Sequence, residues 1–193
     1  MKLTDLYLKE EWDKILGMYK TLMGIAPITF DDTGTLISTP VFTCDACRII
    51  KSSPEGAKRC SDGHRKMVEK AKTTKDTVIE ECHAGFTKVV IPIFNDDEFL
   101  GVTGGCNIFR ENHYIDFNFY LNLASELAVD SSLLLEGVKK AKVVPDRIIA
   151  QQNQILQMKI SARLKLENFK KRRIEIQKNL DDNLKKLLES MRS

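Results

Sequence analysis

The sequence predicts an α+β fold, and three observations carry this prediction. Apolar residues near the N-terminus recur at helical spacing, and two later regions read as pairs of short strands joined by tight turns. The tail after Pro145 has no internal Pro or Gly, which predicts one long helix. Helices and antiparallel hairpins in separate runs are typical of α+β domains. With 193 residues, 42% of them hydrophobic, the chain can bury one good core plus an appendage.

The N-terminal half predicts a long helix, a hairpin and two further helices. The first helix should begin at Thr4 or Asp5 and end at Gly24, because apolar residues recur there at helical spacing. Ser53 and Pro54 start another helix, with Ser as N-cap and Pro at the first helical position. The expected bounds are 25–30 and 35–38 for the hairpin strands, about 44–51 for a short helix and 53–72 for the helix that Ser53 caps.

The following segment predicts a strand, a second hairpin and a helix. Pro92 within this hairpin indicates an edge position or a bulge, since proline cannot donate to a ladder. Gly101, Gly104 and Gly105 leave the last strand bare, so that another group can approach it closely. The expected bounds are 77–82, 87–94 and 98–108 for the strands and about 117–142 for the helix.

The tail predicts a coiled coil with an imperfect seam. Two sets of residues repeat every seven positions, but polar members such as Lys159 and Arg173 weaken the seam, so packing on another partner is an alternative. We therefore expect two domains, residues 1–144 and a long basic helix over 145–193 for dimerisation or signalling. The seam residues are Ile148, Ile155, Ala162, Phe169 and Ile176, then Gln152, Lys159, Leu166, Arg173 and Leu180, with Leu184, Leu187 and Met191 after a stutter.

The net charge of +3 is unevenly distributed. From Asp146 onward there are 12 Lys and Arg against 6 Asp and Glu, so the basic character belongs to the tail. The N-terminus lacks the features of a secretory signal, and no apolar stretch approaches the ~20 residues needed to span a bilayer. These observations predict a cytoplasmic protein without membrane contact, in which thiols stay reduced.

Four of the five cysteines lie between positions 44 and 82, which suggests a metal site. Four thiolates suit tetrahedral zinc or an iron–sulfur cluster, and a Cys-x-x-Cys step lets two of them face one ion. The alternative is that some of these cysteines are core residues, because free cysteine is often buried as a small hydrophobe. The candidate metal ligands are Cys44, Cys47, Cys60 and Cys82, with His64 and His83 as substitutes.

Short motifs form a recognisable series between about Asp5 and Ala128. They are the segment 42–51 around Cys47, the run Ser52 to Cys60, Cys82-His83-Ala84-Gly85-Phe86, Pro92-Ile93, and Leu100-Gly101 leading into Gly104-Gly105. Together these motifs resemble the PocR family of prokaryotic sensory domains. The resemblance implies a PAS-like or GAF-like antiparallel sheet of about five strands with flanking helices. It also implies sensing of a simple hydrocarbon derivative, such as a short diol, and a link to an output module.

The chain departs from the family pattern at three points. Cys44 adds a cysteine just before the usual one. Cys106 stands where members often carry glutamine, so the ligand of other members does not transfer directly. No output domain follows the motifs, only the long basic helix.

A pocket for an organic ligand is the second interpretation of this region. A mostly apolar pocket with a few polar anchors suits a small alcohol, aldehyde or acid. Arg48 or Arg59 could hold a carboxylate, although both also fit a solvated helix face. The candidate ligand-binding residues are Phe30, Arg48, His83, Phe86, Gly104 and Cys106.

Catalysis and nucleic-acid binding find little support. Cys82 and His83 are neighbours on an expected strand and point to opposite faces, so they do not form a thiolate–imidazole pair. No P-loop, Rossmann glycine run or His-Glu-x-x-His is present. Phe169, Ile174 and Ile176 lie around the basic cluster 170–173 at helical spacing, which fits a packed helix with a solvated basic face. We predict neither an enzyme nor a nucleic-acid-binding protein.

The sequence thus predicts the ligand-sensing domain of a prokaryotic signal transduction protein. It would bind a small molecule in a cysteine-lined pocket and signal through the C-terminal helix. The alternative is a redox or oxygen sensor with an iron–sulfur cluster, or a zinc protein. The expected partners are a second copy of the chain through this helix, and a kinase or regulator.

Overall fold

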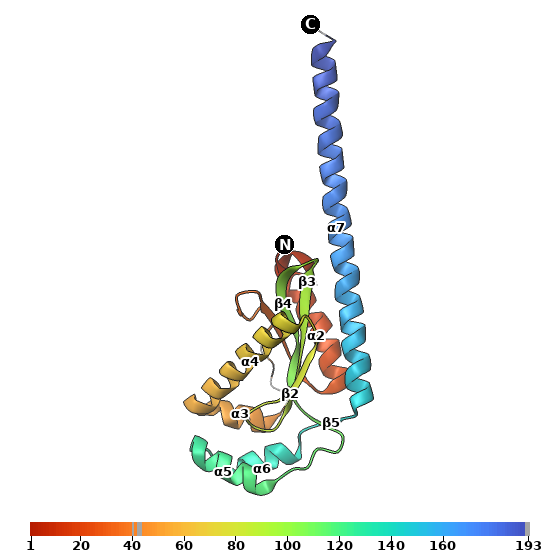
Figure 1. Ribbon diagram of the computed structural model, residues 1–193. Coiled ribbons are helices and arrows are strands. Elements are labelled where there is room, and N and C mark those ends of the chain that lie inside the picture. The colour runs from red at the N-terminus through yellow and green to blue at the C-terminus, as the bar shows by residue number, and fades with distance from the viewer. Residues whose placement is uncertain (40, 42–43, 192–193) are drawn as a thin grey trace. The chain divides into compact units, whose positions relative to one another are not determined.

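A five-stranded sheet forms the centre of this computed structural model (Figure 1). The strands are β1 (Ala26–Asp31), β2 (Val78–Glu81), β3 (Thr87–Asn95), β4 (Glu98–Arg110) and β5 (Val143–Val144). Four of them are antiparallel in the order β1-β4-β3-β2, and β5 pairs in parallel with β4. The structure describes residues 1–39, 41 and 44–191, so Phe42 in the motif at 42–51 lies outside the described residues.

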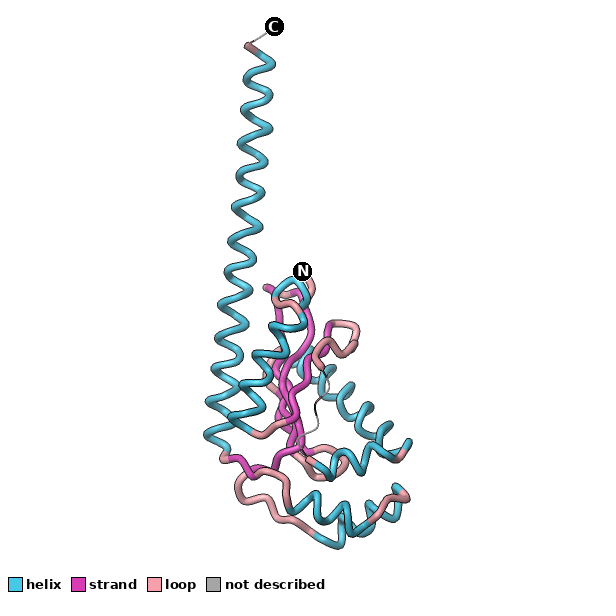
Figure 2. The backbone as a smooth tube through the Cα atoms, turned by 180° about the vertical axis from the view of Figure 1, so that it is seen from behind, coloured by secondary structure: helices cyan, strands magenta, loops and turns pink. Residues whose placement is uncertain are grey.

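Helices cover both faces of the sheet, which confirms the predicted α+β class. The helices are α1 (Leu3–Leu6), α2 (Lys9–Met23), α3 (Asp45–Ser52), α4 (Pro54–Thr74), α5 (Phe117–Leu127), α6 (Ser131–Lys139) and α7 (Asp146–Ser190). Figures 1 and 2 show α2 on one face of the sheet and α4 on the other. The helices α3, α5 and α6 pack together beyond one end of the strands (Figure 1).

The N-terminal helix is divided, where the sequence predicted one continuous helix. Tyr7 and Leu8 have extended backbone angles, and α2 begins anew after them. The Leu8 N–H donates to the Glu11 carboxylate at 2.9 Å, which satisfies one of the free donors at the start of α2. The predicted end is correct, because Gly24 caps α2 in the left-handed conformation.

The first predicted hairpin is only partly formed. Residues 35–38 make a single bridge, between Leu36 and Phe30, instead of a strand. β1 pairs over its whole length with β4, which lies far away in the sequence. The prediction for Pro92 is correct: it lies on β3 beyond the part that pairs with β2, so its missing N–H breaks no ladder on that side.

The helix predicted over 117–142 is two helices. α5 ends at Ala128, which adopts a left-handed conformation with φ of 53°. α6 begins after Asp130, whose side chain accepts a hydrogen bond from the Leu133 N–H at 2.8 Å. The local N-cap allows the chain to reverse, and Leu134 and Val138 of α6 are then buried with α5 residues.

The first turns of α7 pack with the body through a face that the predicted seam does not include. Ile149 and Leu156 are buried, and the buried Asn153 accepts a hydrogen bond from the Tyr19 hydroxyl of α2. Ile155, a predicted seam residue, is 57% exposed. The compact body extends to Leu156, and residues 157–193 form a separate unit that consists of the rest of α7 and the C-terminal end.

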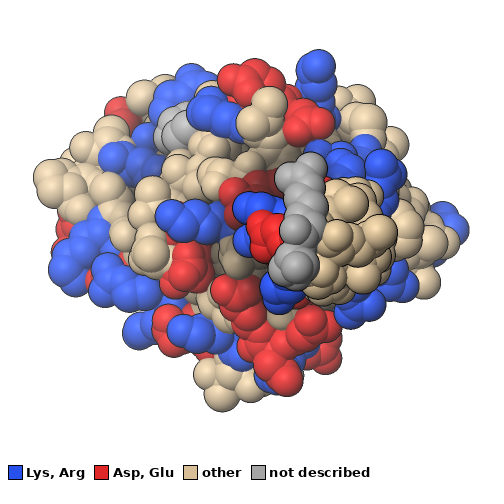
Figure 3. Space-filling view, turned by 90° about the horizontal axis from the view of Figure 1, so that it is seen from above, with Lys and Arg blue, Asp and Glu red and all other residues tan. Residues whose placement is uncertain are grey.

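The surface carries charges of both signs. On the face that Figure 3 shows, Lys and Arg side chains are interspersed with Asp and Glu side chains. In the described part of the chain, no helix combines the length and apolar character that crossing a bilayer requires.

Candidate functional site

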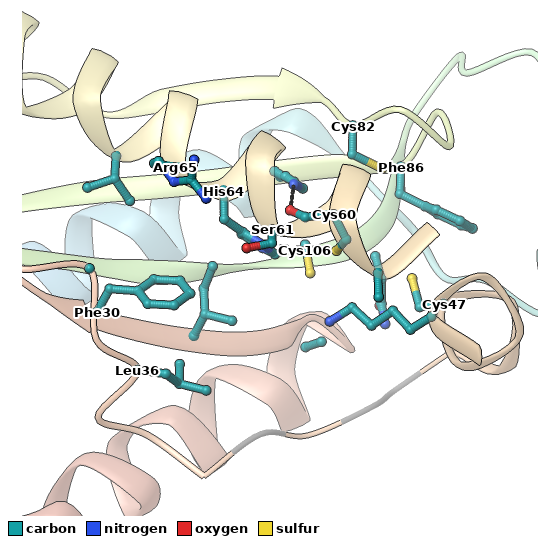
Figure 4. A pocket seen from close by; sticks show the side chains of 18 of the residues that line it. Phe30, Leu36, Cys47, Cys60, Ser61, His64, Arg65, Cys82, Phe86 and Cys106 are labelled. Carbon is teal, nitrogen blue, oxygen red and sulfur yellow. Dashed lines mark hydrogen bonds between the residues drawn. The ribbon is translucent and has the colours of Figure 1, made fainter. Parts of the chain in front are cut away.

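A cavity of about 550 Å³ lies between α4 and the sheet, and this size is typical of a small-molecule site. Its wall combines residues of β1, α3, α4, β4 and the turn between β2 and β3. Figure 4 shows Phe30 and Leu36 towards one end, and Cys47, Cys82 and Phe86 towards the other. The cavity therefore has one end with large apolar side chains and another end rich in sulfur. Its wall also includes the charged residues Asp32, Lys51, Arg65 and Glu69.

One face of α4 forms a wall of the cavity. Ser53 caps the helix by accepting a hydrogen bond from the Gly56 N–H, and Pro54 occupies the first position, as predicted. The wall residues include pairs three or four positions apart, which places them on one face. They are Ala57, Cys60, Ser61, His64 and Val68.

A β-bulge forms the floor opposite α4. Thr87 pairs with Ile108 and Val89 pairs with Gly105, so Lys88 on β3 lies opposite two residues of β4, Cys106 and Asn107. The extra residue disrupts the normal alternation, and both Cys106 and Asn107 line the cavity. Asn107 has φ of 71°, a conformation that asparagine tolerates better than most side chains.

The turn after β2 closes the sulfur-rich end. Gly85 has φ of 74°, which a side chain rarely adopts, and the Cys82 N–H donates to the Phe86 carbonyl oxygen at 2.8 Å. The Tyr120 hydroxyl of α5 donates to the Ala84 carbonyl oxygen at 3.2 Å. The turn is thus held by its own backbone and by α5, and it directs Cys82, His83 and Phe86 to the cavity wall.

A lysine and two histidines give the cavity a polar interior. Lys88 is only 2% exposed, and its Nζ donates to the Cys60 carbonyl oxygen at 3.5 Å. His64 is 9% exposed. Nε2 of His64 and both ring nitrogens of His83 are buried without a hydrogen-bond partner among the described residues.

Burial, together with the nearby charge of Lys88, lowers the pKa of His64 to about 3. Burial and Lys88 also lower the pKa of His83. Both rings are therefore neutral at pH 7, and each can donate or accept one hydrogen bond according to its tautomer.

The His64 pKa predicts a loss of stability in mild acid. The unfolded chain takes up a proton at His64 near pH 6.5, whereas the folded chain resists it down to about pH 3. The stability that neutral His64 contributes is therefore present above pH 6.5 and is lost as the pH falls towards 3, by at most about 1.4 kcal/mol per pH unit. Urea unfolding measures the free energy of unfolding at pH 6.5 and at pH 5.0. Between these two values it should fall by about 2 kcal/mol more in the wild type than in His64→Gln. An equal loss in both proteins would contradict the assignment.

Cys44 and Cys47 form a hydrogen-bonded pair at the start of α3. The Cys47 thiol stabilises the Cys44 thiolate, so the pKa of Cys44 is lowered to about 7. The same hydrogen bond, together with burial, raises the pKa of Cys47. Cys44 is the N-cap residue of α3, and its Sγ lies 3.6 Å from the Gly137 carbonyl oxygen of α6.

Four cysteines line the cavity, and three of them are among the four predicted metal ligands. Cys47, Cys60 and Cys82 are joined there by Cys106, while Cys44 lies at the α3–α6 contact. Burial raises the pKa of Cys82, and it raises that of Cys106 to about 12, so these two groups are neutral thiols at pH 7. Over residues 1–39, 41 and 44–191, no group of three or more His, Cys, Asp or Glu is arranged to hold a metal ion. Metal binding stays a prediction.

The predicted ligand-binding residues fall into two groups. Phe30, His83, Phe86 and Cys106 line the cavity. Gly104 does not, because it lies within β4 between Ile28 and Val90.

The two arginines considered as carboxylate anchors also lie elsewhere. Arg48 has a side chain that is 66% exposed and pairs with Asp45 at 3.2 Å. Arg59 pairs with Glu55 at 2.7 Å and Glu126 at 2.8 Å. Both arginines therefore lie on solvated helix faces, which was the alternative to carboxylate binding.

Lys88 and Asn107 were missed by the reasoning from sequence. Lys88 directly precedes the apolar run 89–91 of β3, and a single lysine inside a buried strand was the signal that could have found it. Asn107 gave no such signal, because its position depends on the bulge.

One family model matches most of the chain. Residues 5–167 match the model described as the sensory domain found in PocR. No curated protein and no solved structure matches the chain. Since the matched segment covers well over half of the sequence, the chain belongs to the family of the sensory domain found in PocR.

Proposed function

We propose that this protein is a non-catalytic, cytoplasmic sensor that binds a small organic molecule in the cavity beneath α4. The observation that carries the proposal is the cavity itself, because about 550 Å³ of space is lined by apolar side chains together with several polar groups. Membership of a sensory family supports a role in ligand recognition and signalling. The cysteines serve as wall residues that pack against the ligand.

The signal leaves the cavity along β4. Cys106 and Asn107 line the cavity, and two residues later Phe109 pairs with Val143 of β5. Arg110 then pairs with Asp146 at the start of α7, with Nε and Oδ1 2.7 Å apart. Ligand occupancy would favour one arrangement of the β4 bulge, and this contiguous route would shift the population of α7 arrangements.

α7 is proposed to deliver the signal by pairing with α7 of a second copy. In the body, α7 packs through Ile149, Asn153 and Leu156, which leaves Ile155 on a different, exposed face. The same seam continues through the tail with apolar side chains that are all exposed. They are Leu166, Phe169, Ile176, Leu180, Leu184, Leu187 and Met191. A partner helix would bury these side chains in a coiled coil, and a kinase or regulator would bind to the paired helices.

The test is a panel of C3–C6 alcohols, diols, aldehydes and carboxylates screened by thermal unfolding of the full chain. A compound at 100 times its Kd should raise the Tm by about 5–10 °C. Sedimentation of the same samples reports dimerisation, and hydrogen exchange over 143–156 reports the signal. Exchange there should change only with compounds that raise the Tm.

A cavity-filling variant separates specific binding from general solvent effects. Ala57→Phe places a ring at the cavity wall and should abolish the Tm increase. Ala150→Phe makes the same change at an exposed position of α7 and should respond like the wild type. If Ala57→Phe responds as strongly as the wild type, the compound does not bind in this cavity and the proposal fails.

A further inference from the structure

The ammonium of Lys88 is buried in the cavity wall with little compensation from the protein. Its only hydrogen bond among the described residues is the long one of 3.5 Å to the Cys60 carbonyl oxygen. No described carboxylate lies within ion-pair distance of Nζ. An ammonium carries three N–H donors, so two of them lack a protein acceptor, and a buried cation in this state is unfavourable.

The groups around Lys88 do not supply the missing negative charge. The pKa values of Cys82 and Cys106 are raised by burial, so both sulfurs carry their protons. His64 and His83 are neutral, because burial lowers their pKa values. These four neighbours therefore supply no anion to Lys88. Elsewhere in its wall the cavity is also lined by two cations, Lys51 and Arg65, and by two carboxylates, Asp32 and Glu69.

The unpartnered histidine nitrogens lie around the same space. His64 Nε2 has no partner among the described residues, and His64 and Lys88 both line the cavity. In the tautomer that carries a proton on Nε2, His64 donates one hydrogen bond without carrying charge. A carboxylate has two oxygens and accepts from both kinds of donor at once.

We propose that the ligand of this cavity is a small carboxylate, with one oxygen held by Lys88 Nζ and the other by His64 Nε2. The hydrocarbon part of the acid would lie towards Phe30 and Leu36, which line the apolar end. A neutral alcohol or diol leaves the Lys88 charge uncompensated and binds less tightly. This inference rests on the proposed function and names the ligand class for the same cavity.

Gly63 of α4 offers an independent way to disturb Lys88. A Cβ at Gly63 would lie 3.0 Å from Lys88 Nζ, which is closer than most real contacts. Gly63→Ala therefore keeps every charge and adds a good helix former, but it moves the ammonium from its present position. Weaker carboxylate binding in this variant would come from geometry alone.

The test compares butyrate with its neutral isostere butyramide and with butane-1,2-diol, on the full chain dialysed free of carboxylates and phosphate. Calorimetry should show butyrate binding at least ~10-fold more tightly than either neutral probe. Lys88→Met should reduce butyrate affinity at least ~10-fold and leave butyramide unchanged. Gly63→Ala should weaken butyrate binding, and Lys66→Met, the same charge change at an exposed position of α4, should not.

Thermal unfolding without any probe tests whether Lys88 serves binding or folding. Methionine has a similar length and no charge, so Lys88→Met should unfold at the same temperature as the wild type or higher. A lower Tm would show that the ammonium stabilises the fold, and the inference would be wrong.

Two further outcomes separate this inference from the proposed function. If butyramide or the diol binds as tightly as butyrate, the cavity binds neutral molecules, and only the carboxylate assignment fails. If butyrate and longer acids up to octanoate all leave the Tm unchanged, the assignment also fails. The cavity-filling variant Ala57→Phe reports on the sensor function independently of these acids.

Discussion

Gly104→Ala should destabilise the protein strongly. Gly104 lies in the middle of β4, where it pairs with Ile28 of β1 on one side and Val90 of β3 on the other. Its φ is 156°, and a Cβ would overlap the carbonyl oxygen of Val89. That atom belongs to the backbone of the neighbouring strand, so it cannot move without disturbing the sheet.

The expected loss in the free energy of unfolding is more than about 4 kcal/mol, which is a large part of the 5–15 kcal/mol typical of a domain. Urea unfolding followed by circular dichroism measures it. Gly17→Ala is the matched control, because a Cβ at Gly17 of α2 would have no atom within 4 Å. This substitution should raise the free energy of unfolding by up to about 1 kcal/mol. A Gly104→Ala protein with the wild-type urea midpoint would refute the close approach of β3 and β4.

Phe86→Ala should destabilise the protein by about 3–5 kcal/mol. Phe86 is almost fully buried, and its ring stacks on Phe109 with centroids 4.8 Å apart. Removing the ring leaves a void between the β2–β3 turn and β4, and it also enlarges the cavity, which Phe86 lines. The same contact connects the cavity to Phe109, which pairs with β5.

Phe86→Leu is the control for this prediction. Leucine fills most of the same volume, so the loss should be about 1 kcal/mol. Both variants are measured by urea unfolding at pH 7. Equal stability of Phe86→Ala and the wild type would mean that the ring does not pack in the core as described.

Local signals in the sequence predicted much of the secondary structure correctly. Gly24 ends α2, Ser53 and Pro54 start α4, and Pro92 lies beyond the part of β3 that pairs with β2. These residues act through their own backbone geometry, which does not depend on distant parts of the chain. The predictions failed where one long helix was expected and the structure has two shorter helices, as at Leu8 and Ala128.

The cavity was predicted only in part for the same reason. Phe30, His83, Phe86 and Cys106 were identified, but the role of Lys88 depends on a register shift between β3 and β4. Arg48 was the cation predicted to bind the ligand, yet it lies on an exposed face and pairs with Asp45. Charge and residue type alone do not distinguish a buried cation from a solvated one.

The amino-acid sequence by itself determined the α+β class, the family and the residue types around the cavity, because spacing, caps and motifs are properties of neighbouring residues. Only the tertiary structure decided that β1 pairs with β4, that Cys44 does not line the cavity with the other four cysteines, and that Lys88 is buried. These features depend on long-range strand pairing and on a single extra residue in β4, whose free energies come from contacts between segments far apart in the chain.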